Sequence, residues 1–565
     1  MILATGLASC KKDFLEETPL SFLSTANAFK TEADFTASIN NLYGLVRSHY
    51  YNQNDGNPFQ YKYRSDGFLE SRTSSPNLPG DISPTGVVGF AWGPHYKIIA
   101  EANTVISRIP ASSLTDAQKT LFQAKASFFR ALAYRALGYL YGGVPLVLEE
   151  IEVPKTDFTR ATRKEVYAQA IKDLEFAVAN LPAINAVKDG EISKPAAYHL
   201  LAEVFNADGQ YQKAVDAATA VITTPNMSLM TARFGSRQSI PAQSPYPAIT
   251  GDVYWDLFQP KNQNRGSGNR EAIWVMQFET DVPGGGASTT GGNQSGVYAL
   301  ERVHAPLFRD VTINNVAPFR WPIGDFTGGR GVGFLAPSPW FSDTVWRNSG
   351  TDIRNANHNF IRDFIATNPA SPFYGQIVST KAVPPGTKGF NGETLVTGKQ
   401  NSAFYPYQSK ATTPFLHPAP LYLTPNSTDP VRKWELSTGA GGTYRDEYMF
   451  RLAETYLLRA EAYLGLGNTA LAAADINVVR NRSQATPVTA AQINIDYILD
   501  ERMRELGVEE HRNLTLMRLG KWVDRLRRCN PFFASQLQNH FNLWAIPNSE
   551  IERNRTAKLE QNPGY

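Results

Sequence analysis

The spacing of apolar residues divides the chain into two helical parts separated by a long irregular part. In a series of segments, apolar side chains recur three and four residues apart, which is the period of a helix with one buried face. In the clearest segment this stripe contains Tyr211, Ala214, Val215, Ala218 and Val221. The same criterion predicts helices at about 25–50, 95–109, 116–141, 163–180, 195–207, 211–223, 445–466, 470–482 and 496–506.

Residues 226–440 break the helical period. They contain glycine runs at 284–286 and 291–296 and many prolines, and the short apolar piece Ala272–Phe278 predicts a strand. Helical hairpins need neighbours to bury their apolar faces. The hairpins on the two sides of this region are therefore expected to pack together, which makes 226–440 an insertion in one scaffold.

The two helical parts repeat each other when the chain is aligned with itself at a shift of 258. The matched pairs are Ala202 and Ala460, Phe205 and Tyr463, Gly209 and Gly467, Ala214 and Ala472, and Val221 and Val479. A helix, a turn with glycine and a second helix, with small residues where the helices touch, are typical of a tetratricopeptide repeat. Chance similarity between two amphipathic hairpins is the alternative, and the matched small residues on both sides of the turn favour a true repeat.

The first ten residues predict a lipid anchor. Residues 2–9 are small or apolar, and Leu7-Ala8-Ser9-Cys10 resembles a bacterial lipobox, in which the cysteine is acylated after cleavage. Two or three acyl chains anchor a protein durably. An ordinary apolar N-terminus with a buried cysteine is the alternative. No stretch of the chain reaches 18 apolar residues, so no transmembrane helix is expected.

Composition excludes several classes of function. The net charge of +3 over 565 residues gives no electrostatic footprint for nucleic acid. The eight histidines are scattered, and the glycine-rich segments 328–333 and 392–399 lack the spacing of nucleotide-binding loops. We therefore expect no cofactor, no metal and no nucleic-acid partner. Cys529, the other cysteine, is expected to be an inert structural thiol.

Five groups of residues, in order along the chain, resemble signatures of the SusD/RagB family of nutrient-uptake lipoproteins. Together with the lipobox, they span essentially the whole chain. The groups are Trp92, Tyr96, Ile99, Ala102 and Asn103; Phe128–Tyr134 with Leu140–Leu146; Glu501–Leu506 with Glu510-His511-Arg512 and Leu516–Trp522; Ile546–Ile551; and Gln561–Tyr565.

The resemblance implies a lipid-anchored, surface-exposed glycan-binding protein that is not an enzyme. Its expected place is the outer membrane, facing the cell exterior, with a SusC-like TonB-dependent transporter as partner. The fold class implied with the helical pattern is mainly α, a tetratricopeptide-type scaffold with a loop-rich insertion containing short strands. The expected parts are 1–10 (signal remnant), 11–24 (tether), 25–225 (N-terminal helical part), 226–440 (ligand-side insertion) and 441–565 (C-terminal helical part).

Three other functions stay open on the sequence. Some members of the family serve peptide import, so the ligand class is not fixed. A tetratricopeptide scaffold that binds only proteins is a second alternative, which the long insertion argues against. A carbohydrate-active enzyme is the third, because a glycosidase needs only two facing carboxylates among 52 acidic residues.

Two stretches combine flat rings with polar side chains, as a sugar site requires. Rings stack on the apolar faces of sugars, and polar groups bind the hydroxyls. The candidate ligand-binding residues are Tyr61, Tyr63, Arg64, Asp66 and Asp81 in the first stretch, and Trp321, Trp340 and Trp346 in the insertion.

The charged residues of the C-terminal signature are expected to be structural. Glu501, Arg502, Glu505, Glu510 and Arg512 include the groups that acid–base catalysis uses. Ion pairs on and between helices explain them without a reaction.

Overall fold

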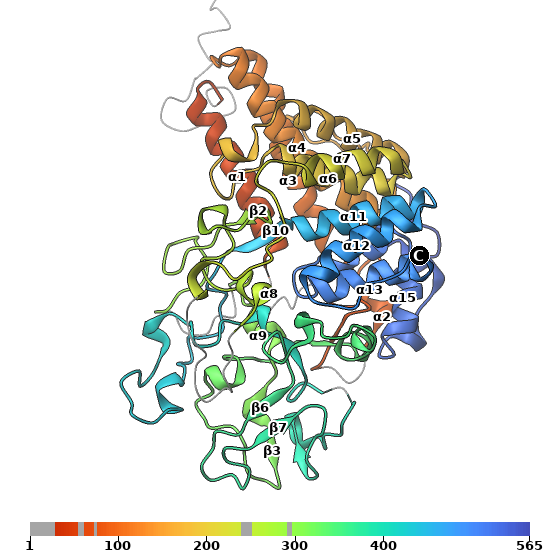
Figure 1. Ribbon diagram of the computed structural model, residues 1–565. Helices are drawn as coiled ribbons and strands as arrows, with labels where there is room; N and C mark the ends of the chain where they lie inside the picture. Colours follow the sequence, from red (N-terminus) through yellow and green to blue (C-terminus); the bar gives the residue numbers. More distant parts are fainter. Residues whose placement is uncertain are drawn as a thin grey trace, which may run out of the picture.

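The computed structural model describes residues 29–52, 54, 61–72, 76–238, 251–290, 297–399 and 401–565. Cys10 and the predicted tether lie outside these residues. Helices dominate the two ends of the described chain, and the segment between them, green and teal in Figure 1, is mostly irregular. The predicted fold class, mainly α with a loop-rich insertion that contains short strands, is confirmed.

The helices agree closely with the apolar periodicity, and α4 and α5 have the predicted bounds at both ends. Thr115 and Gln118 form a capping box at the start of α4. The α-helices are α1 (Glu32–Tyr50), α2 (Leu78–Asp81), α3 (Trp92–Arg108), α4 (Asp116–Tyr141), α5 (Arg163–Asn180), α6 (Lys194–Ala207), α7 (Tyr211–Ile222), α8 (Val253–Asp256), α9 (Leu300–His304), α10 (Pro339–Ser342), α11 (Leu452–Gly465), α12 (Thr469–Arg482), α13 (Ile495–Leu506), α14 (Arg512–Arg518), α15 (Trp522–Cys529) and α16 (Asn548–Arg553).

The shift of 258 relates two observed hairpins, α6–α7 and α11–α12. Adding 258 to the bounds of α6 gives the bounds of α11. The turn glycines Gly209 and Gly467 have φ of +72° and +75°, a conformation that side chains with a Cβ rarely adopt. The matched Ala202 and Ala460 are both fully buried. The repeat is therefore structural.

The two hairpins pack on each other across the insertion in the chain. α11 lies against α6 and α7 (Figure 1). His199 Nδ1 of α6 is 2.8 Å from Thr455 Oγ1 of α11, and Asn206 Nδ2 donates to Leu458 O at 2.9 Å. One hydrophobic core joins both helical parts, from Phe35 to Leu559.

Antiparallel strand pairs organise the rest. β2 pairs with β10, so the insertion leaves the scaffold and returns to it side by side. This pairing corrects the predicted helix 445–466, whose first residues form β10; Phe450 pairs with Trp274 of β2, and this tertiary contact overrides the local helical pattern. The strands are β1 (Phe68–Glu70), β2 (Ala272–Met276), β3 (Thr312–Ile313), β4 (Leu335–Pro337), β5 (Phe360–Ile361), β6 (Asp363–Ile365), β7 (Ile377–Ser379), β8 (Thr387–Lys388), β9 (Tyr407–Gln408) and β10 (Glu447–Arg451).

Candidate functional site

The first predicted stretch is buried in the core. The Tyr61 ring is fully buried and stacks on Tyr50, with ring centroids 5.5 Å apart, and its hydroxyl lies 2.7 Å from His49 Nε2. Tyr63 is also buried, with the guanidinium of Arg64 over its ring at 4.0 Å. Neither ring offers an open face for stacking in this structure.

The acidic residues of that stretch hold arginines. Asp66 is fully buried and pairs with both Arg512 and Arg525. Burial would raise the pKa of Asp66, but the charges of these two arginines outweigh it and lower the pKa to about 2. Asp81 pairs with Arg64 at 2.8 Å and is partly exposed. Asp66 therefore has a structural role. Its carboxylate is fully buried, so it cannot make the ligand contacts that the sequence predicts.

The three tryptophans of the insertion differ in exposure. Trp346 is buried and donates its indole N–H to Phe341 O at 2.7 Å. Trp340 is partly buried against the core and donates to Asp500 Oδ1 at 3.0 Å. Trp321 is 54% exposed. It is the predicted ring that the structure leaves open to a ligand.

Trp321 borders a cavity of about 270 Å³ in the insertion. Its walls combine apolar side chains with guanidinium groups from separate segments, which sequence reasoning did not single out. No periodicity or motif marks these arginines, and only their position beside glycines or turns is visible in the sequence. The described lining is Arg72, Arg302, Leu307, Phe308, Arg309, Trp321, Ile323, Arg330, Gly331 and Val332.

Backbone pairing fixes the position of each wall. Arg72 follows β1, and Ser71 N donates to Phe334 O at 3.0 Å beside β4. Arg302 belongs to α9, where its carbonyl accepts from Val332 N at 2.9 Å. A Cβ on Gly331 would lie 2.3 Å from Ala305 O, so this close approach of the two segments requires glycine.

A buried histidine supports the loop that carries Arg330. His417 lies between Glu301 and Asp325, at 2.8 Å and 2.6 Å. Burial would lower the pKa of His417, but the two carboxylates outweigh it and raise the pKa to about 10. Glu301 also accepts the backbone N–H of Arg330 at 2.6 Å. A buried, charged cluster of Glu301, His417 and Asp325 therefore holds the backbone of Arg330 in position.

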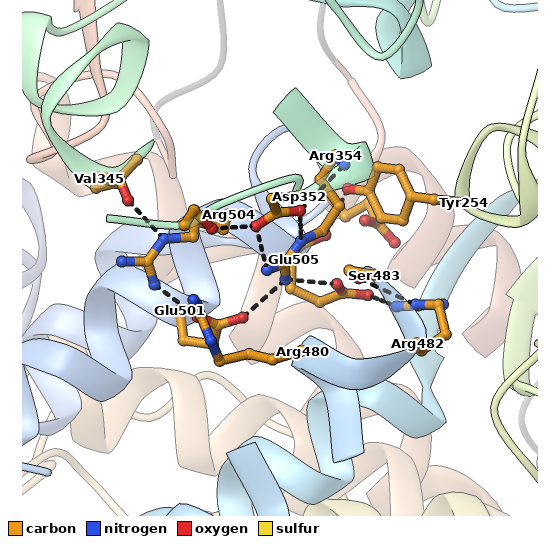
Figure 2. Close-up of polar contacts among 12 residues, drawn as sticks. Tyr254, Val345, Asp352, Arg354, Arg480, Arg482, Ser483, Glu501, Arg504 and Glu505 are labelled. Carbon is orange, nitrogen blue, oxygen red and sulfur yellow. Dashed lines mark hydrogen bonds and ion pairs between the residues drawn. The ribbon is translucent and has the colours of Figure 1, made fainter. Parts of the chain in front are cut away.

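The carboxylates considered for acid–base chemistry lie in a buried ion-pair network (Figure 2). Arg354 of the insertion contacts Glu501 and Glu505 of α13 at 2.8 Å and 2.9 Å. Burial would raise the pKa of Glu501, but the charges of Arg354, Arg504 and Arg480 outweigh it and lower the pKa to about 2. The predicted ion pairs are confirmed, although they are buried and not on a helix surface.

Two further features lie outside the Trp321 cavity. Cys529 is buried, and burial raises the pKa of its thiol to about 11, as expected of an inert structural thiol. A larger cavity of about 500 Å³ lies between α3, the segment 145–158 and α16. Trp92, at its edge, is only 4% exposed and packs against Tyr96 and Tyr141. Trp92 is therefore a core residue and not an open stacking ring.

Comparisons with known proteins agree on one family. The profile of the SusD family matches residues 270–565, and a profile described as starch-binding and associating with the outer membrane matches 13–205. The chain is similar to SusD-like protein P25 of Formosa agariphila, 23% identical over 544 residues, which are 91% of this chain and 88% of that protein. The starch-binding protein SusD of Bacteroides thetaiotaomicron is 32% identical over 121 residues, 21% of each chain.

Solved structures share the fold. A laminarin-binding SusD-like protein superposes with a TM-score of 0.63 at 22% identity, over 95% of this chain and 100% of that one. Surface glycan-binding protein A from Bacteroides thetaiotaomicron, solved in complex with laminarihexaose, gives a TM-score of 0.63 at 17% identity, over 94% and 100%.

Proposed function

The chain belongs to the SusD family, and on this premise we propose that it is a surface glycan-binding lipoprotein that captures oligosaccharides and delivers them to a SusC-like, TonB-dependent outer-membrane transporter. Relatives whose names describe starch or laminarin binding support the ligand class. The observation that carries the proposal within this chain is the exposed ring of Trp321 beside the guanidinium groups of the insertion cavity.

We propose capture without cleavage. A glycosidase holds two carboxylates that face each other across the scissile bond. No carboxylate lines the Trp321 cavity among the described residues, and Glu501 and Glu505 are buried and held by arginines. Wild-type protein should therefore bind oligosaccharides in calorimetry while releasing no new reducing ends. Release at a catalytic rate would refute the binding-protein proposal.

The anchor and the partner are parts of the same proposal. No helix within the described residues is long and apolar enough to cross a membrane. Acylation at Cys10, which lies outside the described residues, would place the protein on the outer membrane, facing the cell exterior. Palmitate labelling that disappears in Cys10→Ser, and co-purification with a large outer-membrane barrel, are the expected results. Labelling that persists in the variant would contradict the lipobox interpretation.

Peptide capture is the alternative within the family, and a protein-binding scaffold is the alternative outside it. A combined glycan and peptide array, probed with wild-type protein and Trp321→Ala, separates them. Glycan signals that depend on Trp321 support the proposal. Peptide signals alone would favour peptide capture, and no signal of either kind would favour the protein-binding scaffold.

A further inference from the structure

The cavity beside Trp321 is lined by four arginines, Arg72, Arg302, Arg309 and Arg330, that come from four separate segments. We propose that this cavity binds the negatively charged group of an acidic oligosaccharide, a carboxylate or a sulfate ester, while Trp321 carries the face of the sugar ring. The inference rests on the proposed function and narrows its ligand class.

Arg72 is the cavity arginine whose contacts best suit an anionic ligand. Its guanidinium lies 5.0 Å from the ring centroids of both Phe334 and Phe390. In the described part of the chain no carboxylate pairs with it. Stacking between rings holds a guanidinium in place while its edge stays available for hydrogen bonds.

Four acidic residues of the insertion pair with cations that do not line the cavity. Glu301 and Asp325 hold His417, and the side chain of Arg320, next to Trp321, pairs with Asp429 and Glu435. These contacts neutralise Arg320, which does not line the cavity, and leave the acids bound to other cations.

A second cavity arginine makes a weak surface ion pair, and a third contacts a backbone carbonyl. Arg309 contacts its neighbour Asp310 at 3.2 Å, in a pair whose arginine side chain is 48% exposed, and such surface pairs are weak. Arg330 donates to the backbone carbonyl of Thr438. A concave surface lined by one sign of charge concentrates the field and favours an anion over a neutral ligand. Guanidinium groups match carboxylate and sulfate oxygens with two parallel hydrogen bonds.

The test compares matched pairs of ligands by calorimetry with the full chain. The first pair is oligogalacturonide and its methyl-esterified form; the second is an oligosaccharide of a sulfated galactan and its desulfated form. At least one acidic form should bind about ten- to a hundredfold more tightly than its neutral match, since a charge-assisted hydrogen bond contributes that much. The ligand pair in which the acidic form binds more tightly shows whether the site prefers a carboxylate or a sulfate ester. Binding of that acidic form should weaken as the salt concentration rises.

Variants assign the effect to the cavity. Arg72→Gln and Arg309→Gln should each weaken binding of the acidic ligand about tenfold and leave the neutral ligand unchanged. Arg347→Gln, an exposed arginine of the insertion outside the cavity lining, is the matched control and should change neither. Melting temperatures check that each variant is folded. If Arg72→Gln unfolds, Arg309→Gln still tests the proposal, because the Arg309 side chain is exposed and its replacement should not disturb the fold.

The outcomes separate this inference from the proposed function. Equal binding of acidic and neutral forms, or acidic binding that ignores both arginine variants, overturns the inference. If neutral oligosaccharides still bind and Trp321→Ala abolishes that binding, the proposed function survives this failure. If no oligosaccharide of either kind binds, both fall together.

Discussion

The guanidinium of Arg512 donates two parallel hydrogen bonds to the carboxylate of Asp66, from Nε at 2.8 Å and from Nη2 at 2.7 Å. The two residues are separated by most of the chain, and both are buried. Arg525 binds the same carboxylate from α15, at 2.8 Å. Asp66 therefore ties the loop after α1 to the C-terminal helices.

Asp66→Asn should lower the free energy of unfolding by about 3–5 kcal/mol, because two buried arginines lose the carboxylate that they share. Asp81→Asn, which disturbs the partly exposed pair with Arg64, is the control and should cost about 1 kcal/mol or less. Urea unfolding at pH 7 measures both. The folded-state pKa of Asp66, about 2, lies below its usual 3.8. Its contribution is therefore present above pH 3.8 and is lost as pH falls toward 2. A gap between wild type and variant that stays constant over this range would contradict the role.

The exposed and buried tryptophans should separate binding from stability. Trp321→Ala should weaken oligosaccharide binding ten- to several-hundredfold with the melting temperature unchanged, because its ring is open to solvent. Trp346→Ala, its buried match, should cost about 3–5 kcal/mol of stability. Calorimetry and thermal melts measure the two effects. If Trp321→Ala binds oligosaccharides as tightly as wild type, the binding site does not include Trp321.

Arg354 joins the insertion to the helical scaffold through Asp352, Glu501 and Glu505 (Figure 2). Arg354→Met should cost about 3–5 kcal/mol, since three buried carboxylates lose a shared cation. Hydrogen exchange should rise first around 339–361. Arg553→Met removes a surface pair with Glu550 and should change stability by less than about 1 kcal/mol. Equal costs for the two variants would mean that the buried network does not hold the insertion.

His417 should make the insertion sensitive to alkali. Its pKa is raised from 6.5 to about 10, so the charged form stabilises the fold fully below pH 6.5, and this contribution is lost as pH rises to 10. His417→Gln should remove this pH dependence while lowering stability at pH 6. Unfolding curves from pH 6 to 10 measure it. A variant that loses stability in parallel with wild type would exclude His417 as the cause.

The isolated segment 440–565 should not fold cooperatively. Its helix α11 packs on α6 and α7, and Asn206 of α6 bonds to its backbone. Without these partners the apolar faces of α11 and α12 stay in water. A thermal melt followed by circular dichroism should show no sharp transition. A cooperative melt would count against one composite scaffold.

The helical part of the fold is predictable because its signals are local. The bounds of α4 and α5 and the 258-residue repeat follow from periodicity and from the turn glycines Gly209 and Gly467. The start of α11 is not predictable in this way, because the preceding residues form β10 through pairing with the distant strand β2.

The candidate site is less predictable because exposure depends on distant contacts. Trp321 and Trp346 both stand in irregular sequence, yet only the surroundings given by the fold distinguish an open ring from a buried one. Asp66 stands beside aromatic residues as a sugar-binding acid would, but its partners lie in α14 and α15. The arginines of the cavity, such as Arg72 and Arg330, come from separate segments, so their grouping around one cavity is visible only in the folded chain.

The pairing of β2 with β10 has a consequence for how such proteins diversify. Because β2 and β10 lie side by side, both ends of the segment 277–446 are fixed at one place, and surface loops within it can change length without moving these ends. Each doubling of a loop costs only about 0.6 kcal/mol in closure entropy. Loops within this segment can thus vary between relatives while its contacts with the scaffold, such as that of Arg354 with Glu501, are kept. A segment transplanted from a relative should fit if it contains counterparts of Asp352 and Arg354. The arginine would then neutralise the buried carboxylate of Glu501 in α13.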